Sequence, residues 1–473
     1  MVKRKKQSSY FVVNEQHYKI VFPFSFGTTN YDTLVVLYVG DKINPSTDTS
    51  CVYSDHSTDK SILQNVPATV SKIDYVQLCQ LVIHVLWCTL PPINNNDRIY
   101  AIDFAKNYKP GNLLDTPIHT KISPVPANRQ ARQMVICMSR IFAFEKWQLF
   151  VTAIEVYRLL KVDLVVAHVN SVLTSIFQLM KQYEAEGILL LRPGIELPYV
   201  DHLNYDPNAE LEYSGQLVLA HECFYEFRES AQFIALLDWD DLLITTTFPT
   251  LPAAFQSASL NHPNLAYFLV NKLESTFVEQ DQDPTKFDLQ KLIEKGVMTK
   301  YSYNSEKMVI RPDRVFGFWV HYTHSKSRKY HSVQMTTNYS VILHLARKIP
   351  KKDNEFKISY MSELNLRQLQ INNRKFMQKT EMEQIMQKLP SELVYFNTIS
   401  NCSKYINAFP TLDIGRSPCL SYSLCTYPKV QLSCTITDNR FVTKQIGKEP
   451  VYYAHVRKSS GFKQSYKGCF ENI

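Results

Sequence analysis

Long apolar runs are missing from this chain of 473 residues. No stretch reaches the roughly eighteen consecutive apolar residues of a membrane-spanning helix. The closest stretch, Tyr75–Leu90, carries Gln77, Gln80 and His84 and is followed by two prolines, so we expect a strand or another buried element. The basic N-terminus also lacks the apolar segment of a signal peptide. The sequence therefore predicts neither a membrane anchor nor a signal peptide.

Short motifs of several common enzyme and metal-binding classes are also absent. The chain contains neither GxGxxG nor GxxxxGK followed by Ser or Thr, which argues against dinucleotide oxidoreductases and P-loop NTPases. It contains no GxSxG, so an α/β-hydrolase is disfavoured. No two cysteines have the CxxC spacing, which argues against a structural zinc site.

The cysteines and charges that are present point to a compartment and exclude one partner class. Five of the ten cysteines lie after residue 400. This distribution is compatible with disulfides and an oxidising compartment, with buried free thiols as the alternative. The net charge of +8 is spread thinly, and the basic runs Lys3–Lys6 and Lys351–Lys352 are not interleaved with aromatic residues. The charge pattern therefore predicts no nucleic-acid partner.

Strand and helix patterns alternate regularly from about residue 133. Short apolar runs predict strands at Met134–Met138, Val162–Val169, Ile188–Leu191 and Phe233–Leu237. Between these runs, apolar residues recur every three to four positions, which predicts three helices. Such alternation predicts an α/β fold, with a mostly parallel Rossmann-type sheet flanked by helices.

Composition divides the chain into three regions. Residues 1–125 are rich in Tyr, Val, Thr, Asn and Ser, which predicts a stem or a small β-rich subdomain. Residues 126–350 hold the alternating pattern and should form the main domain. Residues 351–473 begin with a polar, helix-prone segment, Leu364–Leu389, and end in a cysteine-containing extension.

Three carboxylates follow the last predicted strand, at Asp238, Asp240 and Asp241. Such groups within four positions repel one another in an apolar setting, and a divalent cation removes that penalty. Mg²⁺ and Mn²⁺ prefer oxygen ligands, and residues two apart in extended chain, such as Asp238 and Asp240, can face one ion. The carboxyl end of a strand is also where α/β sheets bind ligands. The alternative is a solvated turn in which Asp238 caps the next element.

Polar residues also follow two of the other predicted strands. Ser139 and Arg140 come after the first strand, and Asn170 comes after the second. Because parallel strands place their carboxyl ends on one edge, these residues and the aspartates predict one ligand crevice. Taken singly, Asn170 is better explained as the residue that leads into a helix cap, and Arg140 as a solvated side chain.

A later segment supplies further candidates. Arg311 and Arg314 flank a Pro-Asp pair, and a strand-like run leads to His321, with His324 as a second candidate. An arginine can pair bidentately with phosphate, and a neutral imidazole can complete the coordination of a metal. The alternative for each histidine is a structural or surface residue.

Several segments taken together resemble glycosyltransferase family 92. The opening of the family is matched by Val135–Ser139, Trp147–Leu160, Val169–Ser171 and Tyr183–Ile188. The helix that precedes the acidic motif of the family is matched by Gly215, Gln216, Ala220 and Cys223. The D-x-D-Asp/Glu signature of the family is matched by Asp238–Asp241. Its later R-P-x-R-V…H segment is matched by Arg311–Val315 and His321. The match covers roughly residues 130–350 in the right order and is specific as a set.

This resemblance implies a GT-A-like fold and a metal-dependent, inverting transfer of a hexose to a glycan acceptor, with UDP-galactose as the expected donor. Mn²⁺, or Mg²⁺, would be held by Asp238, Asp240 and His321. Asn170, Gln216, Arg311 and Arg314 are the candidate residues for binding the UDP-sugar. Asp241 is the candidate catalytic base, because it adjoins the proposed metal ligands.

The resemblance also implies a membrane-associated protein of the Golgi or secretory pathway, although no anchor is recognised in this sequence. Two residues depart from the family pattern: Trp239 replaces a more common aliphatic residue, and Arg140 replaces a common proline. The alternatives are another metal-dependent nucleotide enzyme with the same acidic motif, or a relative that binds glycans or nucleotide sugars without turnover.

Overall fold

The structure is a computed structural model, and it places most of the chain. It describes residues 19–27, 32–41, 50–54, 64–73, 79–91, 99–103, 120–122, 125–126, 128–199, 205–276, 283–323, 325–345, 356–357, 361–408, 419–446 and 449–470. The second candidate histidine, His324, lies outside these residues. No helix within these ranges is both long and apolar enough to cross a membrane.

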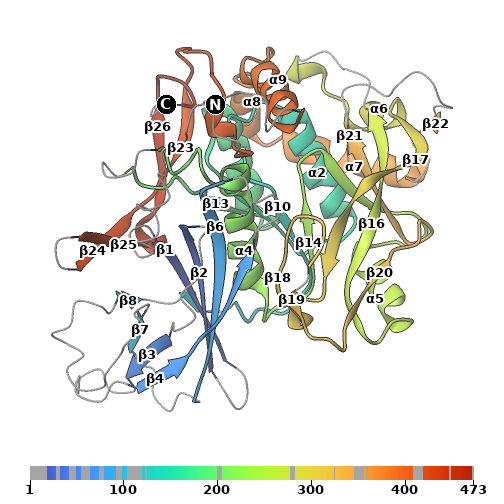
Figure 1. Ribbon diagram of the computed structural model, residues 1–473. Helices are drawn as coiled ribbons and strands as arrows, with labels where there is room; N and C mark the ends of the chain where they lie inside the picture. The colour runs from blue at the N-terminus through green and yellow to red at the C-terminus, as the bar shows by residue number, and fades with distance from the viewer. Residues whose placement is uncertain are drawn as a thin grey trace, which may run out of the picture.

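A ten-stranded sheet forms the centre of the molecule (Figure 1). Its order is β13-β11-β10-β14-β17-β16-β21-β15, with β20 beside β16 and β22 beside β17. The first half comprises β13 (Leu189–Pro193), β11 (Leu164–Val169), β10 (Arg132–Met138) and β14 (Ala231–Leu237). The second half comprises β17 (Val297–Ile310), β16 (Leu265–Thr276), β21 (Ser340–Leu345), β15 (Asp241–Thr245), β20 (His331–Gln334) and β22 (Phe356–Lys357).

The prediction of a mostly parallel sheet is wrong for the second half, so the fold is α/β with a mixed sheet. The four strands from β13 to β14 pair in parallel, as the sequence predicts. By contrast, β17 is antiparallel to both β14 and β16, and β15 is antiparallel to β21. The difference arises because β17 runs back along the strand that precedes it, from Val297 beside Thr276 to Ile310 beside Tyr267, so these two consecutive strands pair antiparallel.

Side chains of the central strands alternate between two apolar layers. On β14, Phe233, Ala235 and Leu237 point into one cluster, while Ile234 and Leu236 point into the other. All five are at most 5% exposed, which explains why the sequence shows an unbroken apolar run here. The strand is therefore held rigidly from both faces, and this fixes the position of the acidic residues that follow it.

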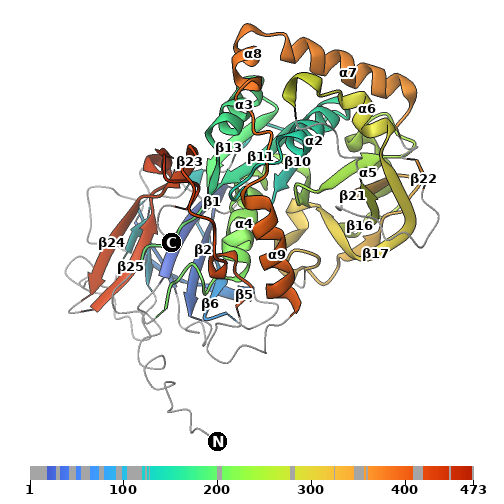
Figure 2. The same cartoon turned by 90° about the horizontal axis from the view of Figure 1, so that it is seen from above.

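Helices cover one face of the sheet, and a helix and a second sheet cover the other (Figure 2). The first face carries α2 (Trp147–Leu159), α3 (Thr174–Ala185), α5 (Leu251–Leu260), α6 (Leu289–Glu294), α7 (Glu363–Met377) and α8 (Thr380–Met386). The second face carries α4 (Gln216–Phe227) and strands of the N-terminal region. The polar segment expected to be one helix is two, because α7 ends before Gln378 and α8 starts at Thr380.

The two ends of the chain share one sheet of seven strands. Its order is β24-β25-β1-β2-β6-β5, with β9 beside β1. These strands are β24 (Phe441–Ile446), β25 (Glu449–His455), β1 (Lys19–Gly27), β2 (Asp32–Asp41), β6 (Leu81–Leu90), β5 (Thr69–Ile73) and β9 (Val125–Pro126). The parallel pair β1–β25 joins residues from the first and last predicted regions. The division into three regions stays a prediction.

The remaining strands form three small sheets. A four-stranded sheet contains β4 (Gln64–Pro67), β3 (Ser50–Ser54), β7 (Ile99–Asp103) and β8 (Thr120–Ile122). A three-stranded sheet contains β12 (Ser171–Leu173), β23 (Cys434–Asp438) and β26 (Gly461–Ser465), and a two-stranded sheet contains β18 (Val315–Gly317) and β19 (Ser325–Lys326).

All ten cysteines form disulfides. The pairs are Cys51–Cys88, Cys79–Cys419, Cys137–Cys223, Cys402–Cys425 and Cys434–Cys469. The pair Cys79–Cys419 spans 340 residues and ties the N-terminal region to the C-terminal extension. The disulfide interpretation of the cysteine pattern is therefore confirmed over that of free thiols.

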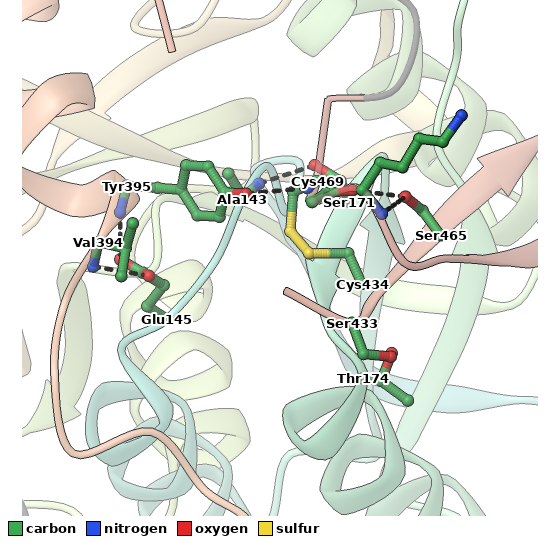
Figure 3. Close-up of a disulfide and its surroundings, with 12 residues drawn as sticks. Ala143, Glu145, Ser171, Thr174, Val394, Tyr395, Ser433, Cys434, Ser465 and Cys469 are labelled. Atoms are coloured by element: carbon green, nitrogen blue, oxygen red, sulfur yellow. Dashed lines mark hydrogen bonds between the residues drawn. A yellow bond between two sulfur atoms is a disulfide. The ribbon is translucent and has the colours of Figure 1, made fainter. Parts of the chain in front are cut away.

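Figure 3 shows how the C-terminal extension is fastened beside the central domain. The Cys434–Cys469 disulfide joins β23 to the end of the chain, and the hydroxyl of Tyr395 accepts a hydrogen bond from the backbone N–H of Cys469 (3.1 Å). Tyr395 begins α9 (Tyr395–Ala408), so these contacts fix the start of that helix.

Candidate functional site

A cavity of about 610 Å³ lies at the carboxyl ends of β10 and β14. Its wall includes Ser139 and Arg140 after β10, and Asp238, Trp239 and Asp240 after β14. Further lining residues are Phe142, Ala143, Phe144, Glu145, Lys146, Leu149, Tyr213, Gln216, Lys307, Trp319, Val320, His321, Leu345, Phe396, Ile399, Ser400, Ser403 and Tyr422. The ligand crevice predicted from the strand ends thus exists around two of the three expected tips.

Asp238 lies in the cavity wall with both carboxylate oxygens engaged. Its Oδ1 accepts a hydrogen bond from Nε2 of Gln216 (3.0 Å), and its Oδ2 pairs with the ammonium of Lys307 (2.5 Å). Burial raises the pKa of Asp238, but the charge of Lys307 outweighs it and holds that pKa below its usual value. Asp238 is therefore ionised at neutral pH.

Asp241 is the most enclosed of the three aspartates, and its side chain does not line the cavity. Its carboxylate contacts the ammonium of Lys272 (2.9 Å), accepts a hydrogen bond from Nδ1 of His344 (2.8 Å) and lies 3.6 Å from Lys307. Burial acts to raise the pKa of Asp241, but the His344 bond and the two lysines hold it far below its usual value. The carboxylate of Asp241 is thus ionised at neutral pH, and Lys272, Lys307 and His344 surround it.

Asp240 differs from its neighbours because its carboxylate makes no hydrogen bond or ion pair with any residue that the structure describes. Burial and the charges of Asp241 and Asp238 raise the pKa of Asp240 to about 6. Its backbone is fixed, since its carbonyl accepts the N–H of Leu345 (2.7 Å). An unpartnered carboxylate at a cavity wall, repelled by two others, is a site that a cation would stabilise.

Carboxylate and imidazole groups form one cluster here, and the set predicted from the sequence overlaps it. Asp240, Asp241 and His344 place their ligand atoms within 4.8 Å of one another. Asp238, Asp240 and His321, the set predicted from the sequence, line the cavity, but their ligand atoms do not all lie within that distance. Both sets offer carboxylate oxygens and an imidazole nitrogen, which are ligand atoms that suit Mn²⁺ or Mg²⁺, and Asp240 belongs to both.

His321 is held in the tautomer that a ligand needs. Its Nδ1 donates to the backbone carbonyl of Glu306 (2.7 Å), which leaves Nε2 with a lone pair. Burial and the charge of Lys307 lower the pKa of His321, so its ring is neutral at neutral pH. Trp319 packs edge-on against this ring at 5.1 Å between centroids.

Gln216 reaches Asp238 from the start of α4 because the chain before it takes an unusual turn. Tyr213, Ser214 and Gly215 all have positive φ, at 46°, 48° and 83°. The left-handed conformation costs on the order of 1 kcal/mol for each non-glycine residue, so other contacts must hold the turn. The hydroxyl of Ser214 supplies one, because it accepts the backbone N–H of Tyr422 (2.9 Å).

Trp239 is almost fully buried, and its role in the structure is clear. Its indole N–H donates to the carbonyl of Ser139 (3.0 Å), and its ring packs near Phe144 and Phe150. The residue that departs from the family pattern thus ties the end of β14 to the end of β10 and forms part of the cavity wall.

Three predicted donor-binding residues lie outside the cavity wall. The amide of Asn170 donates to the carbonyl of Ile195 (2.7 Å) and packs against Gly194. Arg311 and Arg314 follow β17, which runs antiparallel to β14, so they lie toward its opposite end: the guanidinium of Arg311 is 5.6 Å from the ring of Phe233. Arg314 donates to two backbone carbonyls (2.7 Å each). A role of these residues in donor binding stays a prediction.

Lys272, Lys307 and His344 complete the site, and the sequence interpretation missed them. Each comes from a strand of the mixed half of the sheet, and His344 is brought to Asp241 by the register of β15 and β21. One signal was available: Lys307 adjoins the apolar run Met308–Ile310, and a lysine buried next to a core strand needs an acidic partner.

Glu145 positions the helix that forms another wall of the cavity (Figure 3). Its two carboxylate oxygens accept the backbone N–H groups of Val394, Tyr395 and Phe396 (2.8–2.9 Å), at the start of α9. Burial raises the pKa of Glu145, although the three N–H groups oppose that shift. The residues of α9 that line the cavity are Phe396, Ile399, Ser400 and Ser403.

We expect replacement of Glu145 by alanine to cost about 2 kcal/mol of unfolding free energy, because three N–H groups lose a charged acceptor. Urea unfolding measures this cost, and hydrogen exchange should show faster exchange in α9. The matched control is Glu363→Ala at the exposed start of α7, which should change stability by under about 0.5 kcal/mol. Equal effects of the two substitutions would contradict the positioning role of Glu145.

Comparison with known proteins agrees with the resemblance seen in the sequence. Residues 132–406, more than half of the chain, match the model of glycosyltransferase family 92. A family 92 protein of Caenorhabditis elegans is 23% identical over 304 residues, which cover 60% of this chain and 59% of that protein. Two others from that organism are 24% and 26% identical, cover 72% of this chain, and are matched over 69% and 68% of their own lengths.

The chain thus spans less than two thirds of the length of the first of these relatives. Among solved structures, a UDP-glucose pyrophosphorylase complexed with UDP-glucose covers 52% of this chain at 10% identity, and its TM-score of 0.21 is too low to bear on the fold. The family match contains every residue that lines the cavity except Tyr422. This chain belongs to glycosyltransferase family 92.

Proposed function

We propose that this protein is a metal-dependent glycosyltransferase of the GT-A type, which transfers a hexose from a UDP-sugar to a hydroxyl group of a glycan. The observation that carries the proposal is the carboxylate of Asp240, which has no partner among the residues that the structure describes and lies in the wall of a 610 Å³ cavity lined mainly by family-matched residues. UDP-galactose as donor and inversion at the anomeric carbon follow from the family resemblance.

The residues around Asp240 fit a divalent cation. Asp240, Asp238 and His321 are the ligands we propose, and Asp241 with His344 lies close enough to Asp240 to contribute. When bound, the cation would neutralise charge that develops on the departing diphosphate. Gln216 and Lys307 orient Asp238 and keep it ionised for this role.

An acceptor hydroxyl must lose its proton during the transfer. Asp241 is the base proposed from the sequence, and its catalytic role stays a prediction. Its contacts support a positioning role better, because Lys272 and His344 occupy its carboxylate and it does not line the cavity.

We also propose that the protein works in the secretory pathway, in the Golgi. Five disulfides support this location, because they form and persist in oxidising compartments and are rare in the cytosol. Association with a membrane is part of the same proposal and rests on the family resemblance.

A donor screen with the purified protein tests the proposed function. UDP-galactose, other UDP-hexoses and free nucleotides are each incubated with a mixture of glycans and Mn²⁺, with and without EDTA. We expect UDP release and a sugar-extended glycan with UDP-galactose, and at least about 100-fold less product with EDTA. Undiminished transfer in EDTA would contradict the metal proposal, and release of UMP or pyrophosphate would indicate another class of nucleotide enzyme. Donor binding without any product would identify a relative that has lost turnover.

A further inference from the structure

Arg140 brings a positive charge to the cavity, and no acidic residue in the described part of the chain pairs with it. It follows β10, and its Nε donates to the backbone carbonyl of Tyr213 (2.9 Å). Its guanidinium carbon lies 4.7 Å from the ring centre of Phe142 and 5.3 Å from that of Tyr422. Within the described residues, no carboxylate lies within ion-pair distance of this guanidinium, and its two Nη atoms have no hydrogen-bond partner.

Other enclosed arginines of the described structure are satisfied by acids. Arg192 and Arg457 both pair with Glu226, and Arg457 also pairs with Glu222. Placing a charge in a partly buried position without a counter-ion costs free energy. Burial accordingly lowers the pKa of Arg140, although a guanidinium remains charged at neutral pH. One hydrogen bond and two aromatic rings offset part of this cost, but no carboxylate among the described residues balances the charge of Arg140.

The surroundings of Arg140 hold it in one place. Two aromatic rings and one hydrogen bond restrict its side chain, and Tyr213 and Tyr422 belong to the segments that form the left-handed turn and its support. A restrained guanidinium with free Nη–H groups is pre-organised to bind a planar or tetrahedral oxyanion through two parallel hydrogen bonds.

We propose that Arg140 binds an anionic oxygen group, a phosphate, carboxylate or sulfate, of a ligand in this cavity. The proposal rests on the proposed function for the identity of the ligand, which has two possible sources of such a group. One source is the diphosphate of the nucleotide sugar. The other is an acidic sugar of the acceptor glycan, such as a uronic acid or a sulfated residue.

The test compares Arg140→Gln and Arg140→Lys with a matched control, Arg132→Gln. Arg132 lies at the other end of β10, stacks over Phe227 at 5.3 Å and does not line the cavity. Calorimetry measures the binding of UDP with Mn²⁺, inorganic pyrophosphate, a glucuronic-acid disaccharide, a sulfated disaccharide and a neutral disaccharide. Thermal unfolding of each variant checks that it is folded.

We expect Arg140→Gln to weaken the binding of at least one anionic probe by about ten-fold or more, which is the loss of affinity that follows removal of charge-assisted hydrogen bonds. Arg140→Lys should lose less affinity, and Arg132→Gln should bind every probe as tightly as the wild type does. Loss confined to UDP and pyrophosphate identifies the donor, and loss confined to the acidic saccharides identifies the acceptor. Equal binding of all probes by the wild type and a folded Arg140→Gln variant, or no probe binding to the wild type, would overturn the proposal. Calorimetry measures binding without turnover, so this test of Arg140 can be interpreted even if the protein transfers no sugar.

Discussion

Replacing Asp240 with asparagine should reduce sugar transfer at least about 100-fold and at the same time make the metal-free protein more stable. The loss of transfer is expected because even residues that only orient a metal ligand contribute 10- to 100-fold to affinity or activity, and Asp240 is proposed as a direct ligand. The stabilisation is expected because Asp238 and Asp241 repel its charge, which together with burial raises the pKa of Asp240 to about 6.

The pH dependence of this stabilisation follows from the sign of the pKa shift. A carboxyl group with a raised pKa binds its proton more tightly in the folded state, so its ionised form costs stability above pH 6. The metal-free Asp240→Asn variant should therefore exceed the wild type by on the order of 1 kcal/mol at pH 7.5. The difference should shrink as the pH falls through 6 and vanish near pH 4.

Unfolding in urea with EDTA, at several pH values, measures that difference, and transfer assays with Mn²⁺ measure the activity. Glu363→Gln, at the exposed start of α7, is a control that removes a carboxylate remote from the proposed ligands, because Glu363 pairs with Arg367 of the same helix. An Asp240→Asn variant that is less stable than the wild type in EDTA at pH 7.5 would contradict the electrostatic description of the cluster.

Replacing Lys307 with methionine should destabilise the metal-free protein by about 3 kcal/mol. The side chain of Lys307 is 2% exposed and its ammonium lies between Asp238 and Asp241, so its removal takes from Asp238 its ion-pair partner among the described residues and from Asp241 one of three partners. The charges of those aspartates hold the pKa of Lys307 above its usual value against the effect of burial, which shows how strongly the pair is coupled.

Two comparisons separate this charge effect from a packing effect. The double variant Lys307→Met with Asp238→Asn should recover part of the lost stability, because one unpaired charge is removed. Lys291→Met, on the exposed surface of α6, should change unfolding free energy by less than about 0.5 kcal/mol. Mn²⁺ should stabilise Lys307→Met more than it stabilises the wild type. A double variant no more stable than Lys307→Met would assign the loss to packing instead.

The sequence predicted the parallel half of the sheet and its acidic tip well, for a local reason. Strands β10, β11 and β14 are buried on both faces over most of their length, so each appears as a continuous apolar run, and the helices between the strands keep one apolar face. The aspartates at the end of β14 were visible because they interrupt such a run abruptly. Local patterns of this kind need no knowledge of distant contacts.

The mixed half of the sheet and the site residues Lys272, Lys307 and His344 were not predicted, because their positions depend on pairing between strands that are far apart in the sequence. Much of β17 is polar, with Lys300, Asn304 and Glu306 in it, so its sequence lacks an apolar strand signature. His344 reaches Asp241 across 103 residues of sequence, and Lys307 reaches Asp238 across 69. The register of β15 with β21 and of β16 with β17 creates these contacts, and no short motif encodes that register.

The direction of β17 explains why Arg311 and Arg314 lie outside the cavity wall while His321 lines it. Because β17 runs antiparallel to β14, it brings Lys307 beside Asp238, and the residues after Lys307 lie progressively farther from the cavity. The chain then returns to the cavity at Trp319–His321. Spacing in the sequence alone could not separate the arginines from the histidine.

Calorimetric titration of UDP into the wild-type protein, with Mn²⁺ and with EDTA, tests whether a cation held at the end of β14 binds the nucleotide. We expect one UDP site with Mn²⁺, at least about 100-fold weaker binding in EDTA, and a similar weakening for Asp240→Asn in Mn²⁺. UDP binding of equal strength in Mn²⁺ and EDTA, or unchanged by Asp240→Asn, would contradict a cation held at the end of β14.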